Sequence, residues 1–466
     1  MVRSLWSALG GAPESLARLS VVREGAWLGG ALPVDDFAVG AVACALLAAS
    51  DLAQARGAGA PDVQLSGEHA ALSFHSERLA TLDGNPLGAG FAPLSRFVRC
   101  ANGGWARTHG NYPHHAAALL RALGIDPPGA HTVRALEAAA LALDALELEQ
   151  AVFAAGGCAA AVRTAGQWAA HPAGAAAAAD ALVAYDDRGA RAAGSLPQLR
   201  DPARPAHGVR VLDLTRVIAG PVAGRTLAAL GAEVLRVDPP ELPEIQAQHL
   251  DGDAGKRTAL LDLADAPLRE ALLGGADVVL SGYRPGSLER FGMRADQLAE
   301  RHPHLVHVSL SAWGTGGPWA RRRGFDSLVQ AASGIAAECA GPDGAPGALP
   351  AQALDHATGH LMAAAALLAL GRRQSAQPCP APRLSLARTA AQLLAAPRPQ
   401  AVAGELTGRA DAASHRVAFG RLSLIAPPGS LNGVPLAWDH GPRPFGRDAP
   451  RRQGGAAGAC GGRQAP

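Results

Sequence analysis

Asp355 has the setting that most suggests chemistry in this sequence. It stands at the start of "LDHATGHLMAAAALLAL" (354–370), a segment made almost only of Ala, Leu and Met, with no Lys or Arg before Arg372. An Asp at a helix start is most often a cap that accepts hydrogen bonds from the free N–H groups of the first turn. A poorly solvated carboxylate can instead serve as a nucleophile. The segment alone leaves both interpretations open.

Basic side chains stand in several loops that adjoin predicted strands. Such residues are usually solvated turn residues, but ligands of doubly wound sheets gather at the carboxyl ends of the strands. A phosphorylated polyanion would use guanidinium and ammonium groups placed there. The pattern therefore suggests such a ligand without specifying it. The set comprises Arg216, Lys256, Arg257, Arg284, Arg290 and the run Arg321, Arg322 and Arg323.

Other chemistries find less support. The first βαβ pattern, "VRVLDLTRVIAGPVAGRTLAALGAEVLRVD", lacks the G-x-G-x-x-G of dinucleotide-binding folds, although Asp238 ends its second strand. A structural βαβ unit without a ligand stays open. His109, His114 and His115 lie close in sequence, but adjacent histidines rarely ligate one ion and no Cys or carboxylate is near, so no metal site is predicted. Serine hydrolysis would need a G-x-S-x-G pattern that the sequence lacks.

Strands and helices alternate after residue 208. "GVRVLDLTR", "AEVLRVD", "KRTALLDL", "ADVVLSGY" and "HLVHVSLSAWG" are apolar strand patterns separated by turns or helical stretches. This alternation predicts an α/β fold with a doubly wound, Rossmann-like parallel sheet. In the first half, "SRFVRCANGGWARTHGNYPHHAAALLRALG" predicts two strands around a Gly turn and then a helix, which is typical of a smaller α+β domain.

The two parts of the chain share a pattern. "LPVDDFAVG" (32–40) resembles the segment around "LDHATG", because Asp36 and Asp355 are each followed four residues later by Gly and then by an Ala/Leu helix. At the same offset, "LS" at 65–66 matches "LS" at 384–385. We predict a partial duplication. The expected organisation is a partial copy of this unit (1–75), a small-domain-like region (76–170), a linker (171–208), a catalytic domain (209–395) and a divergent C-terminal segment (396–466), disordered over about its last 26 residues.

Composition limits the class of protein. The 466 residues carry a formal net charge of +2, which gives no bias toward nucleic acid. Six cysteines lie far apart without a C-x-x-C pair, so a disulfide framework or zinc site is not expected and a reducing compartment fits best. The N-terminus lacks the apolar core of a signal peptide, and the Ala runs at 174–182 and 363–369 are too short or interrupted to span a bilayer. We therefore expect a cytoplasmic protein without a membrane partner.

Six ordered segments carry a family resemblance. The βαβ unit followed by "GKRTALLDL", "ADVVLSGYRPGSLERFGM", "LVHVSLSAWGTGGP", "GFDSLVQAASGI" and "LDHATGHLMAAAALLAL" resembles the class III CoA-transferases, the CaiB/BaiF family, over about 209–395. Residues 32–75 look like a second copy of the Asp helix and its following strand. "FVRCANGGWARTHGNYPHHAAALLRALG" looks like the family's small domain. The arrangement is similar to two-part members of the family.

The resemblance implies an activity and a site. It implies that Asp355 attacks an acyl-CoA thioester, forming an acyl–aspartyl anhydride and then an aspartyl-CoA thioester that an incoming carboxylic acid resolves. CoA is then a substrate, and no permanently bound cofactor is expected. The family's interlocked dimers imply a homodimer. Carried over by motif, the CoA pocket would comprise Arg216, Ile218, Ala219, Lys256, Arg257, Gly282, Tyr283, Arg284, Arg290, Arg323, Gly324, Phe325 and Asp326.

Departures from the family pattern leave alternatives. Family racemases carry His where this sequence has Phe325, so Phe325 disfavours a 2-methylacyl-CoA racemase, which needs a second acid/base group. A catalytically degenerate CoA-binding paralogue stays open. Asp36 lacks a preceding CoA-binding region and is interpreted as vestigial. No complete small domain follows Asp355, so residues 76–170 or a second chain must supply it. The acids exchanged cannot be read from the sequence.

Overall fold

The central element is a seven-stranded sheet. The protein is described by a computed structural model, which covers residues 1–23, 25–88, 90–126, 129, 131–186, 196–375, 377, 380–399 and 412–451. The strand order is β11-β10-β9-β12-β13-β14-β8, parallel except for β8 at one edge. The first six strands thus have the 3-2-1-4-5-6 order of a Rossmann sheet, which confirms the predicted fold class. The strands are β8 (Ala184–Asp186), β9 (Arg210–Leu214), β10 (Glu233–Asp238), β11 (Lys256–Leu260), β12 (Val278–Ser281), β13 (Val306–Ser311) and β14 (Ala381–Ser385).

Helices connect the strands of this sheet. Gly and Pro residues separate the apolar strand runs from amphipathic stretches, so each strand gives way to a helix that covers the sheet. The connecting helices are α10 (Ala219–Ala229), α11 (Gln246–Gly252), α12 (Ala266–Gly275), α13 (Ala295–Arg301), α14 (Asp326–Ser333), α15 (Ile335–Glu338) and α16 (Ala353–Gln374), with a 3₁₀ turn at Glu289–Phe291; α17 (Leu386–Leu394) follows β14.

The N-terminal residues form a parallel β-α-β unit beside α16. It begins with α1 (Val2–Ala8) and a 3₁₀ turn (Pro13–Arg18), and contains β1 (Leu19–Val22), α2 (Val34–Ala55) and β2 (Val63–Ser66), followed by α3 (Gly67–Ser73) and α4 (Ser76–Leu79). The unit repeats the arrangement of α16, β14 and α17 at the offset seen in the sequence: α2 and α16 each have 22 residues, and Ser66 and Ser385 each cap the helix that follows. This agreement supports the duplication, which stays a prediction.

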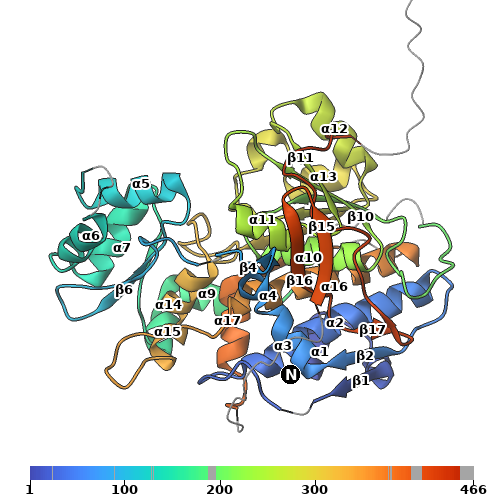
Figure 1. Ribbon diagram of the computed structural model, residues 1–466, viewed down its shortest axis with the longest axis horizontal. Coiled ribbons are helices and arrows are strands. Elements are labelled where there is room, and N and C mark those ends of the chain that lie inside the picture. Colours follow the sequence, from blue (N-terminus) through green and yellow to red (C-terminus); the bar gives the residue numbers. More distant parts are fainter. Residues whose placement is uncertain are drawn as a thin grey trace, which may run out of the picture.

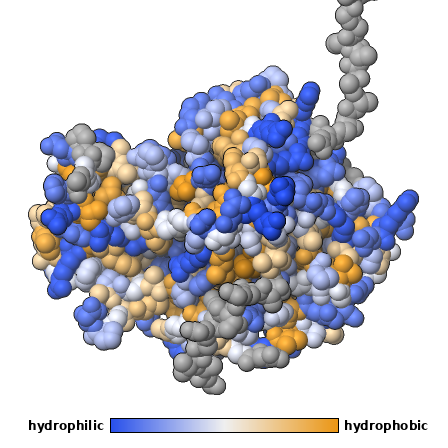
Figure 2. Space-filling model, viewed as in Figure 1, coloured by the Kyte–Doolittle hydropathy of each residue, from blue (hydrophilic) through white to orange (hydrophobic). Residues whose placement is uncertain are grey.

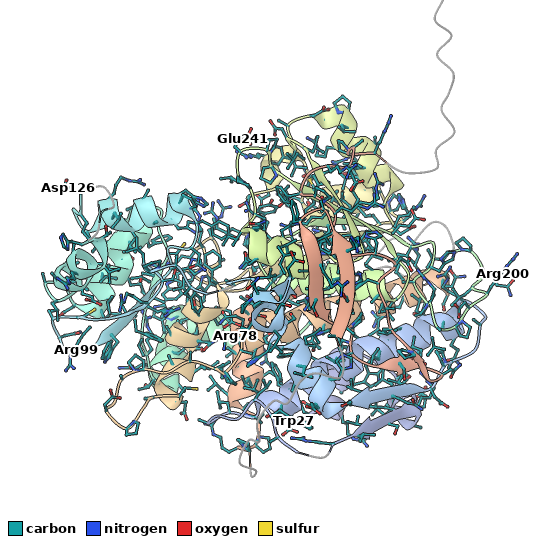
Figure 3. The ribbon with its side chains drawn as sticks, in the orientation of Figure 1. Trp27, Arg78, Arg99, Asp126, Arg200 and Glu241 are labelled. Atoms are coloured by element: carbon teal, nitrogen blue, oxygen red, sulfur yellow. The ribbon has the colours of Figure 1, made fainter. Side chains whose placement is uncertain are left out.

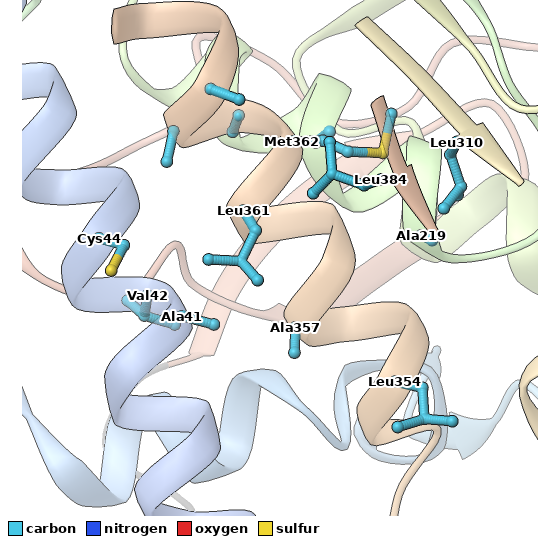
Figure 4. Close-up of a cluster of buried hydrophobic side chains, with 14 of the residues drawn as sticks. Ala41, Val42, Cys44, Ala219, Leu310, Leu354, Ala357, Leu361, Met362 and Leu384 are labelled. Atoms are coloured by element: carbon cyan, nitrogen blue, oxygen red, sulfur yellow. The ribbon is translucent and has the colours of Figure 1, made fainter. Parts of the chain in front are cut away.

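The two long helices pack side by side in the core. Figure 4 shows Ala41, Val42 and Cys44 of α2 facing Ala357 and Leu361 of α16. Small side chains on both helices allow this close approach, as the Ala-rich composition predicts. The helix that carries Asp355 is therefore held by a fixed apolar partner.

The small domain lies apart from the sheet, in cyan in Figure 1. Its antiparallel sheet contains β5 (Phe97–Arg99), β6 (Trp105–Thr108) and β7 (Ala159–Ala161), packed with α5 (Pro113–Ala122), α6 (Thr132–Ala140) and α7 (Ala145–Ala154). It has its own apolar core around Leu119, Leu136 and Leu148. The two strands and helix predicted for 95–124 are confirmed. The domain joins the main sheet through α14, since Arg163 N donates to Ala331 O.

One boundary prediction is wrong. Residues 171–208 are more than a linker, because they contain α9 (Pro172–Ala179) and the edge strand β8, which pairs with β14; α8 (Ala165–Ala170) precedes them. The C-terminal segment folds back on the first half through β15 (Ala412–Val417) and β16 (Gly420–Ile425), which join β3 (Thr81–Leu82) and β4 (Asn85–Pro86), and through β17 (Ser430–Leu431) and β18 (Val434–Pro435), which join β2.

The structure describes only the first part of the tail that is predicted to be disordered. Residues 441–451, which the sequence prediction includes in the tail, lie against β11, where Asp448 N donates to Thr258 O over 2.8 Å. The remainder of that prediction, 452–466, lies outside the described residues.

The helices α2 and α16 are long and apolar enough to cross a membrane. The Ala run 363–369, which is too short to span a bilayer by itself, is only part of α16. The windows that meet the criterion are 89% and 94% buried inside the protein, as in core helices of a globular fold. Figure 2 shows hydrophilic and hydrophobic residues intermixed on one face of the molecule.

Gly359 marks the tightest contact of α16. A Cβ at this position would lie 2.4 Å from Ala219 O and 2.7 Å from Val222 Cβ. We expect Gly359→Ala to lower the free energy of unfolding by about 2 kcal/mol, because α10 must move away. Gly371→Ala in the same helix, where a Cβ meets nothing within 4 Å, should raise it by about 0.5–1 kcal/mol. Urea denaturation of both variants checks this; equal effects would contradict the close approach.

Candidate active site

Asp355 opens into a cavity of about 520 Å³. Its carboxylate is in the first turn of α16 and the residue is only 6% exposed. Distant parts of the chain meet here: α4, the small domain, the loop between β9 and α10, and the start of α14. Figure 3 labels Arg78, on the cavity wall, between the small domain and the main sheet. The lining includes Glu77, Arg78, Phe91, His109, Asn111, Val217, Ile218, Gln248, Phe325, Asp326, Ser327, Gln352 and Asp355.

Asp326 holds the start of α16. Its Oδ2 accepts hydrogen bonds from Leu354 N at 2.9 Å and from Asp355 N at 3.0 Å, and its Oδ1 accepts one from Gln330 Nε2. The capping interpretation of Asp355 is therefore wrong: Asp326, from a different helix, satisfies the free N–H groups. The N-cap residue Gln352 makes no side-chain cap hydrogen bond, and Asp355 lines the cavity.

Asp355 and Asp326 form a coupled pair of buried acids. Burial raises the pKa of Asp355 well above its usual value, and the nearby Asp326 and Glu77 carboxylates raise it further. Burial also raises the pKa of Asp326, to about 6, against three hydrogen bonds that favour its anion. Because those N–H donors point at Asp326, we place the negative charge of the pair on Asp326 and the proton on Asp355.

Glu77 adds a second fixed carboxylate. It lies 3.1 Å from Nε2 of His356, which stacks on Phe74 with ring centroids 5.2 Å apart. Burial acts to raise the pKa of Glu77, but the His356 hydrogen bond and charge outweigh it, and the pKa is lowered. Glu77 is therefore ionised, and its charge disfavours ionisation of Asp355.

The loop before α10 is strained. Val217 has φ 72°, a left-handed conformation that is costly for a β-branched residue. Its N–H donates to Glu244 Oε2 at 3.1 Å, and Glu244 Oε1 accepts from the Tyr112 hydroxyl at 2.6 Å. A hydrogen-bonded carboxylate thus links this loop to the small domain. Strain at this point places Val217 and Ile218 on the cavity wall.

Three residues of the predicted CoA pocket lie with Asp355 in this cavity: Ile218, Phe325 and Asp326. Ala219 is the first residue of α10 and lies against α16 at Gly359. The structure thus brings the proposed nucleophile together with the first βαβ loop and with the "GFD" segment, which lie more than 100 and about 30 residues away in sequence.

Other predicted residues border a second, larger cavity of about 1100 Å³ at the carboxyl ends of β12 and β13. Tyr283 and Arg284 line it, together with Arg294, Arg321 and Arg383. Gly282 adjoins it, and the exposed Arg290 lies 4.5 Å from the ring centroid of Phe291. Arg323 donates to Gly156 O at 3.0 Å, and a Cβ on Gly324 would meet Ala312. This cavity contains the guanidinium groups that a polyanion needs.

Three predicted cations already have partners. Lys256 is fully buried, and its Nζ lies 2.8 Å from Asp213 and 3.4 Å from Asp253. Arg257 pairs with Asp448 at 3.7 Å, and Arg216 lies 3.5 Å from Glu244. Their assignment to CoA stays a prediction, and the geometry of Lys256 favours a structural role.

His109, Glu77 and Asn111 are among the cavity residues that the sequence did not identify as site residues. The histidine cluster drew attention only as a metal site, and among the residues that the structure describes no three His, Cys, Asp or Glu side chains are grouped to hold a metal ion. The small-domain resemblance was the available signal. The described residues 77–111 of the same chain reach Asp355, so one chain supplies this side of the cavity.

Asp36 has a different setting from Asp355. Its carboxylate is half-exposed and paired with Arg23, and it borders a separate cavity with Pro33 and Arg398. A paired, hydrated carboxylate is a weak nucleophile, which agrees with the vestigial interpretation; that interpretation stays a prediction.

Comparisons with known proteins find similarity over part of this chain. The profile of CoA-transferase family III matches residues 206–421. The probable fatty acyl-CoA transferase Rv3272 of Mycobacterium tuberculosis is 37% identical over 190 residues, covering 37% of this chain and 48% of that protein. The human succinyl-CoA:glutarate CoA-transferase is 32% identical, covering 34% and 39%. A crystal structure of Rv3272 covers 42% of this chain and 58% of that one, with 37% identity and a TM-score of 0.40.

The chain spans less than half the length of the curated relatives it matches. The matched region contains the six parallel strands of the main sheet, α16 and Asp355, whereas β8, the small domain and the N-terminal unit precede it.

Proposed function

We propose that the chain is a member of CoA-transferase family III, whose profile matches residues 206–421, and that it moves CoA from an acyl-CoA donor to a carboxylic acid with Asp355 as nucleophile. One observation carries this proposal: Asp355 is a buried carboxylate in a helix start that Asp326 caps, and it opens into a cavity bordered by the family's "GFD" and first βαβ segments.

The proposed exchange proceeds in four balanced steps. An Asp355 oxygen attacks the thioester carbon, the C–S bond breaks, and an acyl–aspartyl anhydride and CoA thiolate form. The thiolate attacks the Asp355 carbonyl and releases the donor acid, leaving an aspartyl-CoA thioester. The acceptor carboxylate attacks this thioester and forms a second anhydride and thiolate. The thiolate then attacks the acceptor acyl carbon, which yields the new acyl-CoA and free Asp355.

The surroundings of Asp355 suit these steps. An ionised Asp355 beside Asp326 and Glu77 is raised in energy by both charges, and acylation removes its own charge. Covalent chemistry at this residue therefore relieves the repulsion that arises when Asp355 ionises. The apolar packing of α2 and α16 keeps water from the rest of the helix.

The larger basic cavity is the proposed site for the phosphates of CoA. Arg284, Arg321 and Arg383 lie along it, and guanidinium groups bind phosphate through paired hydrogen bonds. We further propose a cytoplasmic homodimer, on the basis of the family resemblance. A degenerate paralogue would bind CoA in this cavity without acylating Asp355.

Trapping tests the proposal. Protein incubated with an acyl-CoA and hydroxylamine should acquire a hydroxamate at Asp355, which peptide mass spectrometry locates. A panel of acyl-CoA donors and acceptor acids then identifies the substrates. Binding of CoA without any hydroxamate, over the whole panel, would favour the degenerate paralogue.

The rate of acylation should increase with pH. Only ionised Asp355 attacks, and its pKa is raised by burial, Asp326 and Glu77, so acid conditions leave it protonated. Asp326→Asn removes one neighbouring charge and should lower the pKa of Asp355, which moves the acid limb of the rate profile to lower pH. Stopped-flow acylation rates against pH measure this limb. Asp343→Asn, an exposed position outside the cavity, is the control; an equal shift in that variant would contradict the pairing.

A further inference from the structure

His109 lies in the Asp355 cavity without a role in the steps above. It is 3% exposed and comes from the end of β6, in the small domain, 246 residues before Asp355. Its backbone N–H donates to Cys158 O at 3.0 Å, which fixes the main chain. Its Nδ1 is buried and has no hydrogen-bond partner among the described residues. A buried polar side chain with an unused nitrogen on a cavity wall calls for a functional explanation.

Contacts fix the orientation of the imidazole relative to Asp355. The His109 ring lies flat on the Phe325 ring, with centroids 3.7 Å apart and planes 4° apart. Phe325 directly precedes Asp326, whose carboxylate accepts the N–H of Asp355 at 3.0 Å. One stacking contact and one hydrogen bond thus join the imidazole to the backbone of the proposed nucleophile. Preorganisation of this kind is what a transition-state contact requires.

The imidazole is neutral over the working range of pH. Burial lowers the pKa of His109 to about 3, with further lowering by His115 and Arg107. A neutral imidazole carries one N–H donor and one acceptor nitrogen. Because an orphaned buried N–H is rarer than an orphaned acceptor, we assign the hydrogen to Nε2. The ring then carries a donor that needs no proton transfer to act.

We propose that His109 is a further catalytic residue, whose neutral imidazole donates a hydrogen bond from Nε2 to the carbonyl oxygen of the acyl group attacked by Asp355. This inference rests on the proposed transferase function. Negative charge grows on that oxygen as the Asp355–carbon bond forms, and a fixed donor then binds the transition state more strongly than the thioester. Family racemases carry a histidine at the position of Phe325. In this chain the Phe325 ring instead supplies the flat surface that positions His109.

Substitution separates this role from packing. His109→Phe preserves the aromatic stack and removes the donor, and should reduce kcat for CoA transfer by about 10²-fold with little change in KM. His109→Gln retains a donor amide and should recover part of that loss. His415→Gln is the matched control: the His415 ring also has a buried nitrogen, Nε2, without a partner among the described residues, but it does not line the cavity. Its kcat should stay within about threefold of wild type.

Each outcome decides one point. Equal loss in both His109 variants, or a change confined to KM, would overturn the donor role, as would wild-type kcat in His109→Phe. Solvent deuterium entering the acyl α-carbon in wild type but not in His109→Phe would make His109 a proton-transferring base instead. A wild-type protein that forms no Asp355 hydroxamate would overturn the proposed function itself, and this inference with it. Melting temperatures of all three variants identify any that fail to fold.

Discussion

Asp355→Ala should reduce CoA transfer by on the order of 10⁴-fold or more, since the covalent intermediates cannot form without the carboxylate. The same variant should unfold at a higher temperature at neutral pH. Ionised Asp355 is surrounded by Asp326 and Glu77, and its pKa is raised in the folded protein. The folded state then binds this proton more tightly than the unfolded state, so the group's contribution to stability declines as pH rises above the unfolded pKa. Removing it removes that cost.

The measurements are steady-state transfer rates and thermal unfolding at pH 7. Asp36→Ala is the matched control, because Asp36 occupies the corresponding place in α2 but is half-exposed and paired with Arg23. It should retain transfer within about twofold and should not gain stability. Transfer by Asp355→Ala at the wild-type rate would refute the nucleophile assignment, and loss of transfer in the Asp36 variant would refute the vestigial interpretation.

The sheet could be predicted because its signals are local. Each strand is a short apolar run bounded by Gly or charged residues, and alternation with helices fixes a parallel sheet with few alternative orders. The helices α2 and α16 could be matched for the same reason, since Asp, Gly and the Ala/Leu run recur at a constant offset. The edge strand β8 could not be predicted, because "AYD" has no strand pattern of its own and gains its conformation from pairing with β14.

The candidate site was only partly predictable because its key contacts join distant segments. Nothing in "THGNYPHH" indicates that His109 will stack on Phe325, 216 positions away in the chain. The local pattern likewise left open a capping role for Asp355, which Asp326 performs from a different helix. The family resemblance supplied the nucleophile, whereas the donors around it depend on tertiary packing.

The Lys256-Arg257 pair has two different interpretations in the sequence. A Lys-Arg pair before an apolar strand usually marks a solvated turn, and the resemblance implies a CoA contact. In the structure Lys256 is fully buried between Asp213 and Asp253, while Arg236 neutralises the other side of Asp253 at 3.0 Å. Asp213 also accepts the N–H of Thr215 at 3.0 Å, at the start of the strained loop on the cavity wall. The Lys256 ammonium group thus stabilises the loop on the cavity wall through Asp213.

Lys256→Met should therefore lower the free energy of unfolding by about 3–5 kcal/mol, because it leaves the buried Asp213 carboxylate without its cation and removes one of the cations beside Asp253. Arg257→Met, one residue along the same strand, removes a cation whose partly exposed pair with Asp448 spans 3.7 Å, and should cost about 1 kcal/mol or less. Urea denaturation compares the two variants, and calorimetric titration with CoA gives the second readout. The alternative outcome is that Lys256→Met weakens CoA binding while its free energy of unfolding equals that of Arg257→Met. That result would make Lys256 a ligand contact, and the loop would not depend on the buried ion pairs. A large loss of stability instead means that Lys256 acts on the site only through Asp213, by fixing the loop that carries Val217 and Ile218.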